Sequence, residues 1–335
     1  MICCCAGCSP PLFLHLPSPI HNSALINITA LSLSISLLVQ FATTSLVNKL
    51  ASESPLLWDA PPHRTEAMGP RLLSCFRAGK PRGGSERAAA TGEQTWEEQD
   101  GGEAVVVELF SSQGCATSPA AELVVSRLGR GDFELDVAVV VLAFHVDYWD
   151  YLGWKDPFGA SQWTVRQKAY VEALSLDTMF TPQLFVQGRA HCVGNDDNAL
   201  LHSIAHAPRF PSPTFRATFT RPAPDSLQVS LSGALRTKVD SDGANVMVAL
   251  YESCLVTDCP RGENKGRVLS NDYVVRKLEK LCTVKDISAK KTVSGTVDFP
   301  LWEGFNSCKC GLAVFVQSRS YQIFGSQSFQ LPDDL

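Results

Sequence analysis

Cys115 is the residue of this sequence best suited to chemistry. It lies in the short polar segment Ser111–Pro119, directly after the apolar run Val105–Phe110. That run predicts a buried strand, and Ser118 followed by Pro119 predicts the N-cap and first turn of a helix. A helix N-terminus stabilises negative charge, so we expect the Cys115 thiol to have a pKa below that of a free thiol. The alternative is a buried thiol with a structural role only.

The residue three positions after Cys115 is Ser118 rather than a second cysteine. A dithiol site releases its mixed disulfide by attack of the second cysteine, which serine cannot do. A single thiol can still form mixed disulfides with protein thiols or glutathione, release them to an outside thiol, or shuffle disulfides. This is chemistry of the oxidoreductase or isomerase type, and it needs no bound cofactor other than glutathione. Cys192 is the nearest candidate for an internal resolving thiol.

Residues 104–212 alternate between strand and helix patterns. The expected strands are 105–110, 137–144, 184–187 and 191–193, and the expected helices are 119–128, 161–176 and a last helix from Asn195 or Asp196 to Ala207. Crossover connections between parallel strands are almost always right-handed. With a closing antiparallel hairpin, the order β-α-β-α-β-β-α predicts a thioredoxin-like α/β domain. Another small layered α/β fold is the alternative.

Thr181 and Pro182 immediately precede the third expected strand. In the thioredoxin fold a cis proline faces the reactive cysteine, and the backbone beside it pairs with a bound peptide or glutathione. Cis bonds are essentially confined to X–Pro. We therefore assign Thr181 and Pro182 to the same site as Cys115, with an ordinary turn as the alternative.

An aromatic and acidic segment, residues 145–157, follows the second expected strand. The carboxyl ends of strands in open α/β sheets form the rim where ligands bind. One interpretation is a substrate pocket in which His145 or Asp147 exchanges a proton with Cys115. Its walls would be the large aromatic residues Tyr148, Trp149 and Trp154. A loop that only covers the sheet edge is the alternative. A metal held by His145 and Asp147 is not expected, because soft donors are scarce nearby.

Four stretches of the sequence together resemble one known family. They are Val-Glu-Leu-Phe-Ser-Ser-Gln-Gly-Cys ending at Cys115, His-Val-Asp-Tyr-Trp-Asp-Tyr-Leu-Gly-Trp-Lys-Asp-Pro-Phe from His145, Arg-Gln-Lys-Ala-Tyr from Arg166, and Thr-Pro-Gln-Leu-Phe-Val-Gln-Gly-Arg from Thr181. These are similar to the thioredoxin-like family catalogued as domain of unknown function 1223, which occurs in bacteria and plants. Residues 262–266 and 274–276 resemble the C-terminal part of that family.

The resemblance implies a thioredoxin-like domain with a family-specific β-rich partner, and it implies no particular reaction. Bacterial members typically carry Cys-x-x-Cys-Pro at the active turn. Here Cys115 matches the first cysteine and Ser118 replaces the second, which indicates a plant-type member. The replacement argues against a dithiol reaction and leaves the nucleophilic thiol intact. A non-catalytic binding module that uses residues 145–157 is the alternative function.

Beyond the proline-rich joint Pro208–Pro213 the apolar residues alternate with period two. This pattern predicts an antiparallel β-sandwich-like domain over residues 213–335, with one short helix at Asp272–Leu281. We expect free thiols in this part, because the cysteine spacings fit no common zinc site. A zinc site or disulfides remain alternatives for four cysteines: Cys254, Cys259, Cys308 and Cys310.

The composition limits the partners and the compartment. The 335-residue chain has a formal net charge of −5, which gives no general attraction to nucleic acid. Its 12 cysteines form no obvious paired framework. We therefore expect a reducing compartment, with the cytoplasm as the first choice.

The first hundred residues differ in composition from the rest. Residues 24–42 are apolar and just long enough to span a bilayer, but polar residues dilute them and no positive charge precedes them. We expect residues 1–103 to be disordered or a mis-assigned extension, with Met68 as an alternative start. A membrane-anchored location requires residues 24–42 in the mature protein, and an organellar one stays open.

Overall fold

The computed structural model has a mixed α/β fold, which confirms the expected class. It describes residues 102–238, 242–285 and 291–335. All of these belong to one compact unit, Glu86–Leu335.

The expectations for residues 1–101, including the apolar segment 24–42 and the alternative start at Met68, lie outside the described residues. Within the part that the structure does describe, no helix has both the length and the apolar character needed to cross a bilayer.

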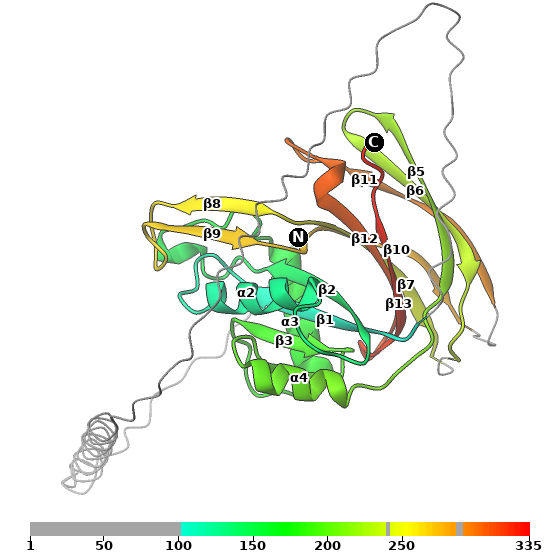
Figure 1. Ribbon diagram of the computed structural model, residues 1–335, viewed down its shortest axis with the longest axis horizontal. Coiled ribbons are helices and arrows are strands. Elements are labelled where there is room, and N and C mark those ends of the chain that lie inside the picture. Colours follow the sequence, from blue (N-terminus) through cyan, green and yellow to red (C-terminus); the bar gives the residue numbers. More distant parts are fainter. Residues whose placement is uncertain (1–101, 239–241, 286–290) are drawn as a thin grey trace, which may run out of the picture. The chain divides into compact units, whose positions relative to one another are not determined.

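A mixed sheet of eight strands forms the centre of the unit, in the order β13-β12-β7-β10-β2-β1-β3-β4 (Figure 1). β2 is parallel to β1 and to β10, and the other neighbouring pairs are antiparallel. The strand bounds are β1 Ala104–Ser111, β2 Ala138–His145, β3 Gln183–Val186, β4 Ala190–Val193, β7 Ala244–Glu252, β10 Val274–Val284, β12 Cys310–Ser318 and β13 Ile323–Gln330.

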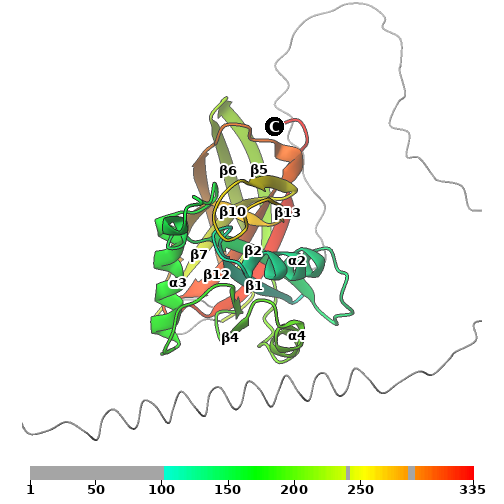
Figure 2. The ribbon, with the colours of Figure 1, turned by 90° about the vertical axis from the view of Figure 1, so that its left-hand side faces the viewer.

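Three α-helices pack on the strands that come first in the sequence, and they occur in the expected order. α2, Ser118–Gly129, and α4, Asp197–Ala205, pack on one face of β1, β2 and β3. α3, Ser161–Ala173, packs on the opposite face (Figure 2). It ends three residues earlier than its apolar pattern suggests. The short 3-10 helix η1, Asp150–Leu152, lies in the connection between β2 and α3.

The period of two in β1 divides its side chains between these faces. Val105, Val107 and Leu109 pack in the core beneath α2 and α4. Val106 and Phe110 pack in the core beneath α3. All five are fully buried, so neither face of this strand is open to solvent, as is typical of a central strand covered on both sides.

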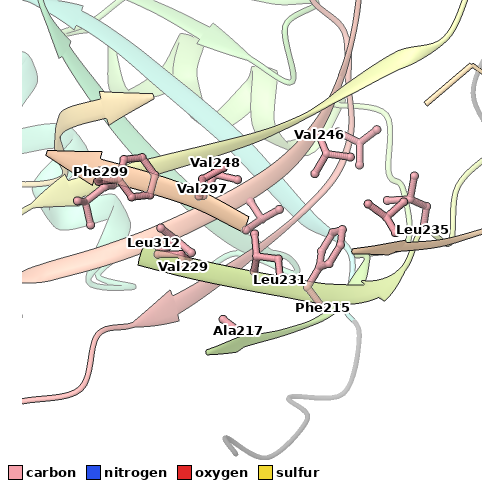
Figure 3. Close-up of a cluster of buried hydrophobic side chains, with 14 of the residues drawn as sticks. Phe215, Ala217, Val229, Leu231, Leu235, Val246, Val248, Val297, Phe299 and Leu312 are labelled. Carbon is pink, nitrogen blue, oxygen red and sulfur yellow. The ribbon is translucent and has the colours of Figure 1, made fainter. Parts of the chain in front are cut away.

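A second sheet packs against β7 and β12 of the large sheet. It has the order β11-β6-β5, with bounds β5 Thr214–Ala223, β6 Ser226–Ala234 and β11 Thr292–Pro300. Figure 3 shows the core between the layers, where Val229 and Leu231 of β6 meet Val246 and Val248 of β7. The two sheets therefore pack face to face, and one of these layers is the same sheet that contains β1 to β4. The segments 104–212 and 213–335 share this continuous sheet.

A two-stranded hairpin, β8 Leu255–Cys259 and β9 Arg267–Asn271, forms no hydrogen-bonded ladder with the other sheets in the described residues. β9 contacts α2, and the hairpin lies beside this helix in Figure 1. The helix expected at Asp272–Leu281 is wrong, because these residues form most of β10. Pairing with β7 over nearly the whole length of β10 decides the conformation of these residues.

A buried ion pair fastens α3 to the large sheet. Arg166 donates to Glu108 Oε1 of β1 from Nε at 3.0 Å and from Nη2 at 2.6 Å. The Tyr170 hydroxyl donates to the other oxygen of the same carboxylate. Gln317 of β12 completes the group, since its Nε2 lies 2.8 Å from the Tyr170 hydroxyl. These contacts explain why Arg166 and Tyr170 occur in one sequence motif, since both bind the same carboxylate. They fix the orientation of α3 on the sheet.

Candidate active site

Cys115 lies in a tight turn between β1 and α2. Its N–H donates to the Ser112 carbonyl at 3.1 Å. The Ser112 N–H donates to Ser118 Oγ at 3.3 Å, and the Ser112 hydroxyl accepts from the N–H of Gly114 at 3.0 Å. The N-cap of α2 is Thr117, and Ser118 is the first helical residue. The helix therefore begins with Ser118 inside it rather than at its N-cap, and the turn is closed by the two serine hydroxyls.

Hydroxyl groups surround the Cys115 sulfur. Sγ lies 3.3 Å from the Thr117 hydroxyl and 3.5 Å from the Thr181 carbonyl oxygen. Burial raises the pKa of Cys115, but hydrogen bonds with the side chains of Ser118, Thr117 and Thr181 lower it further than burial raises it. The net pKa lies below the ordinary value of a thiol. The side chain is also largely covered, at 5% exposure, whereas the next two residues, Ala116 and Thr117, are exposed.

The Thr181 carbonyl faces the thiol, and the peptide bond between Thr181 and Pro182 is cis. The Pro182 carbonyl accepts from the N–H of Gly194 at 2.9 Å. A Cβ at Gly194 would lie 2.7 Å from the Cβ of Pro182 and 2.9 Å from that of Ala121. A side chain at residue 194 would therefore displace Pro182, and with it the carbonyl of Thr181 beside Cys115.

Trp149 forms the wall next to the thiol. Its indole Nε1 donates to Thr181 Oγ1 at 2.6 Å. A Cβ at Gly114 would lie 2.9 Å from the Cβ of Trp149, so the cysteine turn and the tryptophan backbone are in direct contact. Tyr148 lies behind this wall and donates to Gln167 Oε1 at 3.2 Å. Burial raises the pKa of Tyr148 to about 12, so it acts as a neutral donor.

His145 does not reach the thiol. Its fully buried ring lies beneath α2, with Nδ1 2.7 Å from Asp156 Oδ2 and Nε2 3.3 Å from Glu122 Oε1. Burial lowers the pKa of His145, but the carboxylates of Asp156 and Glu122 raise it to about 10. It is therefore a buried imidazolium between two carboxylates, and its contacts do not support direct proton exchange with Cys115.

Asp147 does not point into the site either. Its carboxylate accepts from the Thr164 hydroxyl at 2.6 Å, and its N–H donates back to the same hydroxyl at 3.4 Å. These two bonds hold the start of the aromatic and acidic segment 145–157, called the insert below, against the first turn of α3. Asp147 therefore positions the loop, in contrast to the expected role as a proton-transfer partner.

Trp154 holds the cysteine turn from behind. Its indole Nε1 donates to Gln113 Oε1 at 3.2 Å, and the Gln113 N–H donates to Asp156 Oδ2 at 2.7 Å. The pKa of Asp156 is raised by burial but lowered further by His145 and by these hydrogen bonds, so the carboxylate stays ionised. The insert 145–157 thus supports the turn as well as forming a wall beside it.

Two residues of this site were not recognised from the sequence. Asn264, from the loop between β8 and β9, donates through Nδ2 to the carbonyl oxygens of Gln113 at 2.8 Å and Cys115 at 2.9 Å. Glu122 is 3% exposed, and its carboxylate forms an ion pair with His145, whose Nε2 lies 3.3 Å from Oε1. Asn264 lay within a resembling segment but carried no chemical signal. Glu122 lies one helical turn after Ser118, and this spacing predicts that both side chains lie on the same face of α2.

Among the residues that the structure describes, the other cysteines are free thiols, with Cys254 and Cys308 exposed and Cys259 and Cys310 buried. Burial raises the pKa of Cys192 to about 11, with a smaller contribution from Asp196. The contacts of the Cys115 sulfur do not include Cys192. No group of three or more potential metal ligands is assembled in residues 102–238, 242–285 and 291–335.

Residues 106–317 match the family described as "Protein of unknown function (DUF1223)", and the chain therefore belongs to this family. Among solved structures, a protein from Agrobacterium tumefaciens is 26% identical, with a TM-score of 0.47 over 67% of this chain and 93% of that one. HBP35 of Porphyromonas gingivalis is 14% identical, with a TM-score of 0.49 over 69% of this chain and 76% of that one. A comparison with curated proteins finds no match.

Proposed function

We propose that residues 104–212 are thioredoxin-like and that Cys115 forms mixed disulfides with protein or glutathione thiols. The observation that carries the proposal is the place of the Cys115 sulfur, 3.5 Å from the carbonyl of Thr181 and beside the hydroxyls at the start of α2. The order β1-α2-β2-α3-β3-β4-α4 supports the thioredoxin-like assignment. β7, β10, β12 and β13 extend the same sheet, and the loop between β8 and β9 supplies Asn264, which holds the cysteine turn.

The reaction begins with the Cys115 thiolate attacking one sulfur of a substrate disulfide. The bond between Cys115 and that sulfur forms, the substrate disulfide breaks, and the second sulfur leaves as a thiolate that takes a proton from solvent. The substrate gains the electron pair and Cys115 is oxidised to the mixed disulfide. An outside thiol then attacks the mixed disulfide, and Cys115 leaves as the thiolate that the surrounding hydroxyls stabilise.

Ser118 fits the single-thiol version of this cycle. Its hydroxyl lowers the pKa of Cys115, which favours both attack and departure of this thiol. It cannot displace the bound partner, and Cys192, with a pKa of about 11, is almost fully protonated at neutral pH. The mixed disulfide therefore persists until an external thiol arrives.

The direct test is the pH dependence of Cys115 alkylation by iodoacetamide, followed by mass spectrometry of the Cys115 peptide so that other cysteines do not contribute. We expect a midpoint below the value of about 8.5 for a free thiol. Ser118→Ala removes one stabilising hydroxyl and raises the midpoint. Ser203→Ala, in α4, serves as the control and leaves it unchanged.

Exchange is measured on the same protein with glutathione disulfide as the probe. A Cys115 adduct that forms in the native protein and is absent in Cys115→Ser supports the proposal. An ordinary or raised midpoint together with no Cys115-dependent adduct rejects it. A protein that loses its binding partners in Trp149→Ala and keeps them in Cys115→Ser is a binding module instead.

A further inference from the structure

The insert presents an exposed aromatic ring close to the thiol. Tyr151 is 77% exposed, and its ring is stacked on the Trp149 indole with centroids 6.4 Å apart and an interplanar angle of 17°. Trp149 is itself bonded to Thr181, whose carbonyl faces the Cys115 sulfur. The aromatic pair is thus fixed to the wall of the site, and the outer side of Tyr151 is open to a ligand.

Asp150 precedes Tyr151 in η1, and its Oδ1 accepts from the Asp156 N–H at 3.1 Å. Burial raises the pKa of Asp150, and the charges of Asp156 and Asp147 add to the increase, with Lys155 acting in the opposite direction. Lys155 is the one basic residue that the sequence places between residues 147 and 156. In the described part of the chain, neither Asp147 nor Asp150 forms an ion pair with Lys or Arg. A positive charge beside Tyr151 would relieve this repulsion.

We propose that Tyr151 and Asp150 select polypeptide substrates that carry an arginine or lysine near the reactive cysteine, and that they disfavour glutathione. This inference rests on the proposed function of Cys115 and names its substrate class. A guanidinium group stacks on an aromatic face and pairs with a carboxylate at the same time, which a lysine does less well. Glutathione has two carboxylates and a net negative charge at neutral pH, so the carboxylates of the insert repel it.

The geometry also limits where the basic residue must lie. An extended peptide advances about 3.3 Å per residue. The tyrosine ring is separated from the thiol by Thr181 and the indole of Trp149. A side chain roughly two to four residues from the substrate cysteine therefore reaches Tyr151.

The experiment uses the full-length protein and a series of mixed-disulfide peptides that differ at one position, three residues from the cysteine. The position is Arg, Lys, Ala or Glu, and glutathione disulfide is a fifth probe. We expect the rate of Cys115 adduct formation to fall in the order Arg, Lys, Ala, Glu, with glutathione disulfide among the slowest. High salt reduces the differences, because the interaction is between exposed charges.

Two variants separate the contributions. Tyr151→Leu keeps an apolar side chain without the aromatic face, and Asp150→Asn keeps the acceptor that binds the Asp156 N–H. Each should reduce the ratio of the Arg rate to the Glu rate by about two- to fivefold. Glu172→Gln, an exposed carboxylate on α3, is the control and leaves the ratio unchanged.

Equal rates for all four peptides, with adduct formation still dependent on Cys115, overturn this inference and leave the proposed function standing. A ratio that is high in the native protein and unchanged in both variants also overturns it, because the selection then lies elsewhere. Absence of any Cys115-dependent adduct with every probe removes the proposed function and this inference together.

Discussion

Replacement of Asn264 tests whether the loop between β8 and β9 holds the Cys115 turn. Its amide donates to two carbonyl oxygens, those of Gln113 and Cys115, and the residue is 1% exposed. A buried hydrogen bond contributes about 1 kcal/mol net, and unpaired buried carbonyls add to the loss. Asn264→Ala should therefore reduce the free energy of unfolding by about 2–3 kcal/mol. That is a fraction of the roughly 5–15 kcal/mol of a typical domain, so the variant still folds.

The pKa of Cys115 gives a second measure of the Asn264→Ala substitution. The low pKa of Cys115 depends on hydroxyl groups that the turn holds in place, so we expect the alkylation midpoint to rise towards that of an ordinary thiol. The two readouts are urea unfolding followed by circular dichroism and the pH dependence of alkylation. Asn198→Ala, at an exposed position on α4, is the matched control.

Asn264→Asp removes the Nδ2 donor and keeps an acceptor oxygen, so it tests the two roles of the side chain separately. The aspartate keeps the oxygen that accepts from Arg267 Nη1 at 2.7 Å but places a carboxylate against two carbonyl oxygens. It should destabilise the protein at least as much as Asn264→Ala. The reasoning is refuted by an Asn264→Ala protein whose unfolding and alkylation profiles both coincide with those of the native protein.

Three further predictions concern the buried charges and the shared sheet. Glu108→Gln leaves the Arg166 guanidinium with an incomplete partner and should cost about 3–5 kcal/mol in chemical denaturation; a loss below 1 kcal/mol would contradict the role of this ion pair. Because the folded pKa of His145 is about 10 and the ordinary value is 6.5, its contribution is complete below pH 6.5 and is lost as the pH rises to about 10. The difference in unfolding free energy between native protein and His145→Gln should shrink over that range, and a constant difference rejects the buried imidazolium. A fragment ending at residue 212 lacks β10 beside β2 and should aggregate or lack fixed tertiary structure in near-ultraviolet circular dichroism; a soluble, cooperatively unfolding fragment would show that this region folds alone.

Much of the region around Cys115 could be predicted because its signals are local. The turn between an apolar strand and a helix, and the Thr181-Pro182 pair before the third strand, depend on residues within about ten positions of one another. The buried position of His145 was also readable from the sequence. It continues the alternation of Val141 and Ala143, which face α2, so a strand period of two places its ring beneath the helix.

The parts that could not be predicted depend on distant pairing. β10 lies next to β2 through a single parallel bridge between Val274 and Ala143, and no local pattern indicates such a partner. The expected helix at 272–281 was wrong for the same reason. The role of Asn264 depends on a hydrogen bond to Cys115, 149 residues earlier. A single asparagine in a glycine-rich loop gives no indication of that contact.

That separation along the chain has a consequence for synthesis. Ribosomes add about 5–20 residues per second, so the 149 residues between Cys115 and Asn264 take about 8–30 seconds to appear. During this interval the newly made thiol exists without the loop that later holds it. The hydrogen bonds that hold the Cys115 turn are therefore complete only after most of the chain has been made.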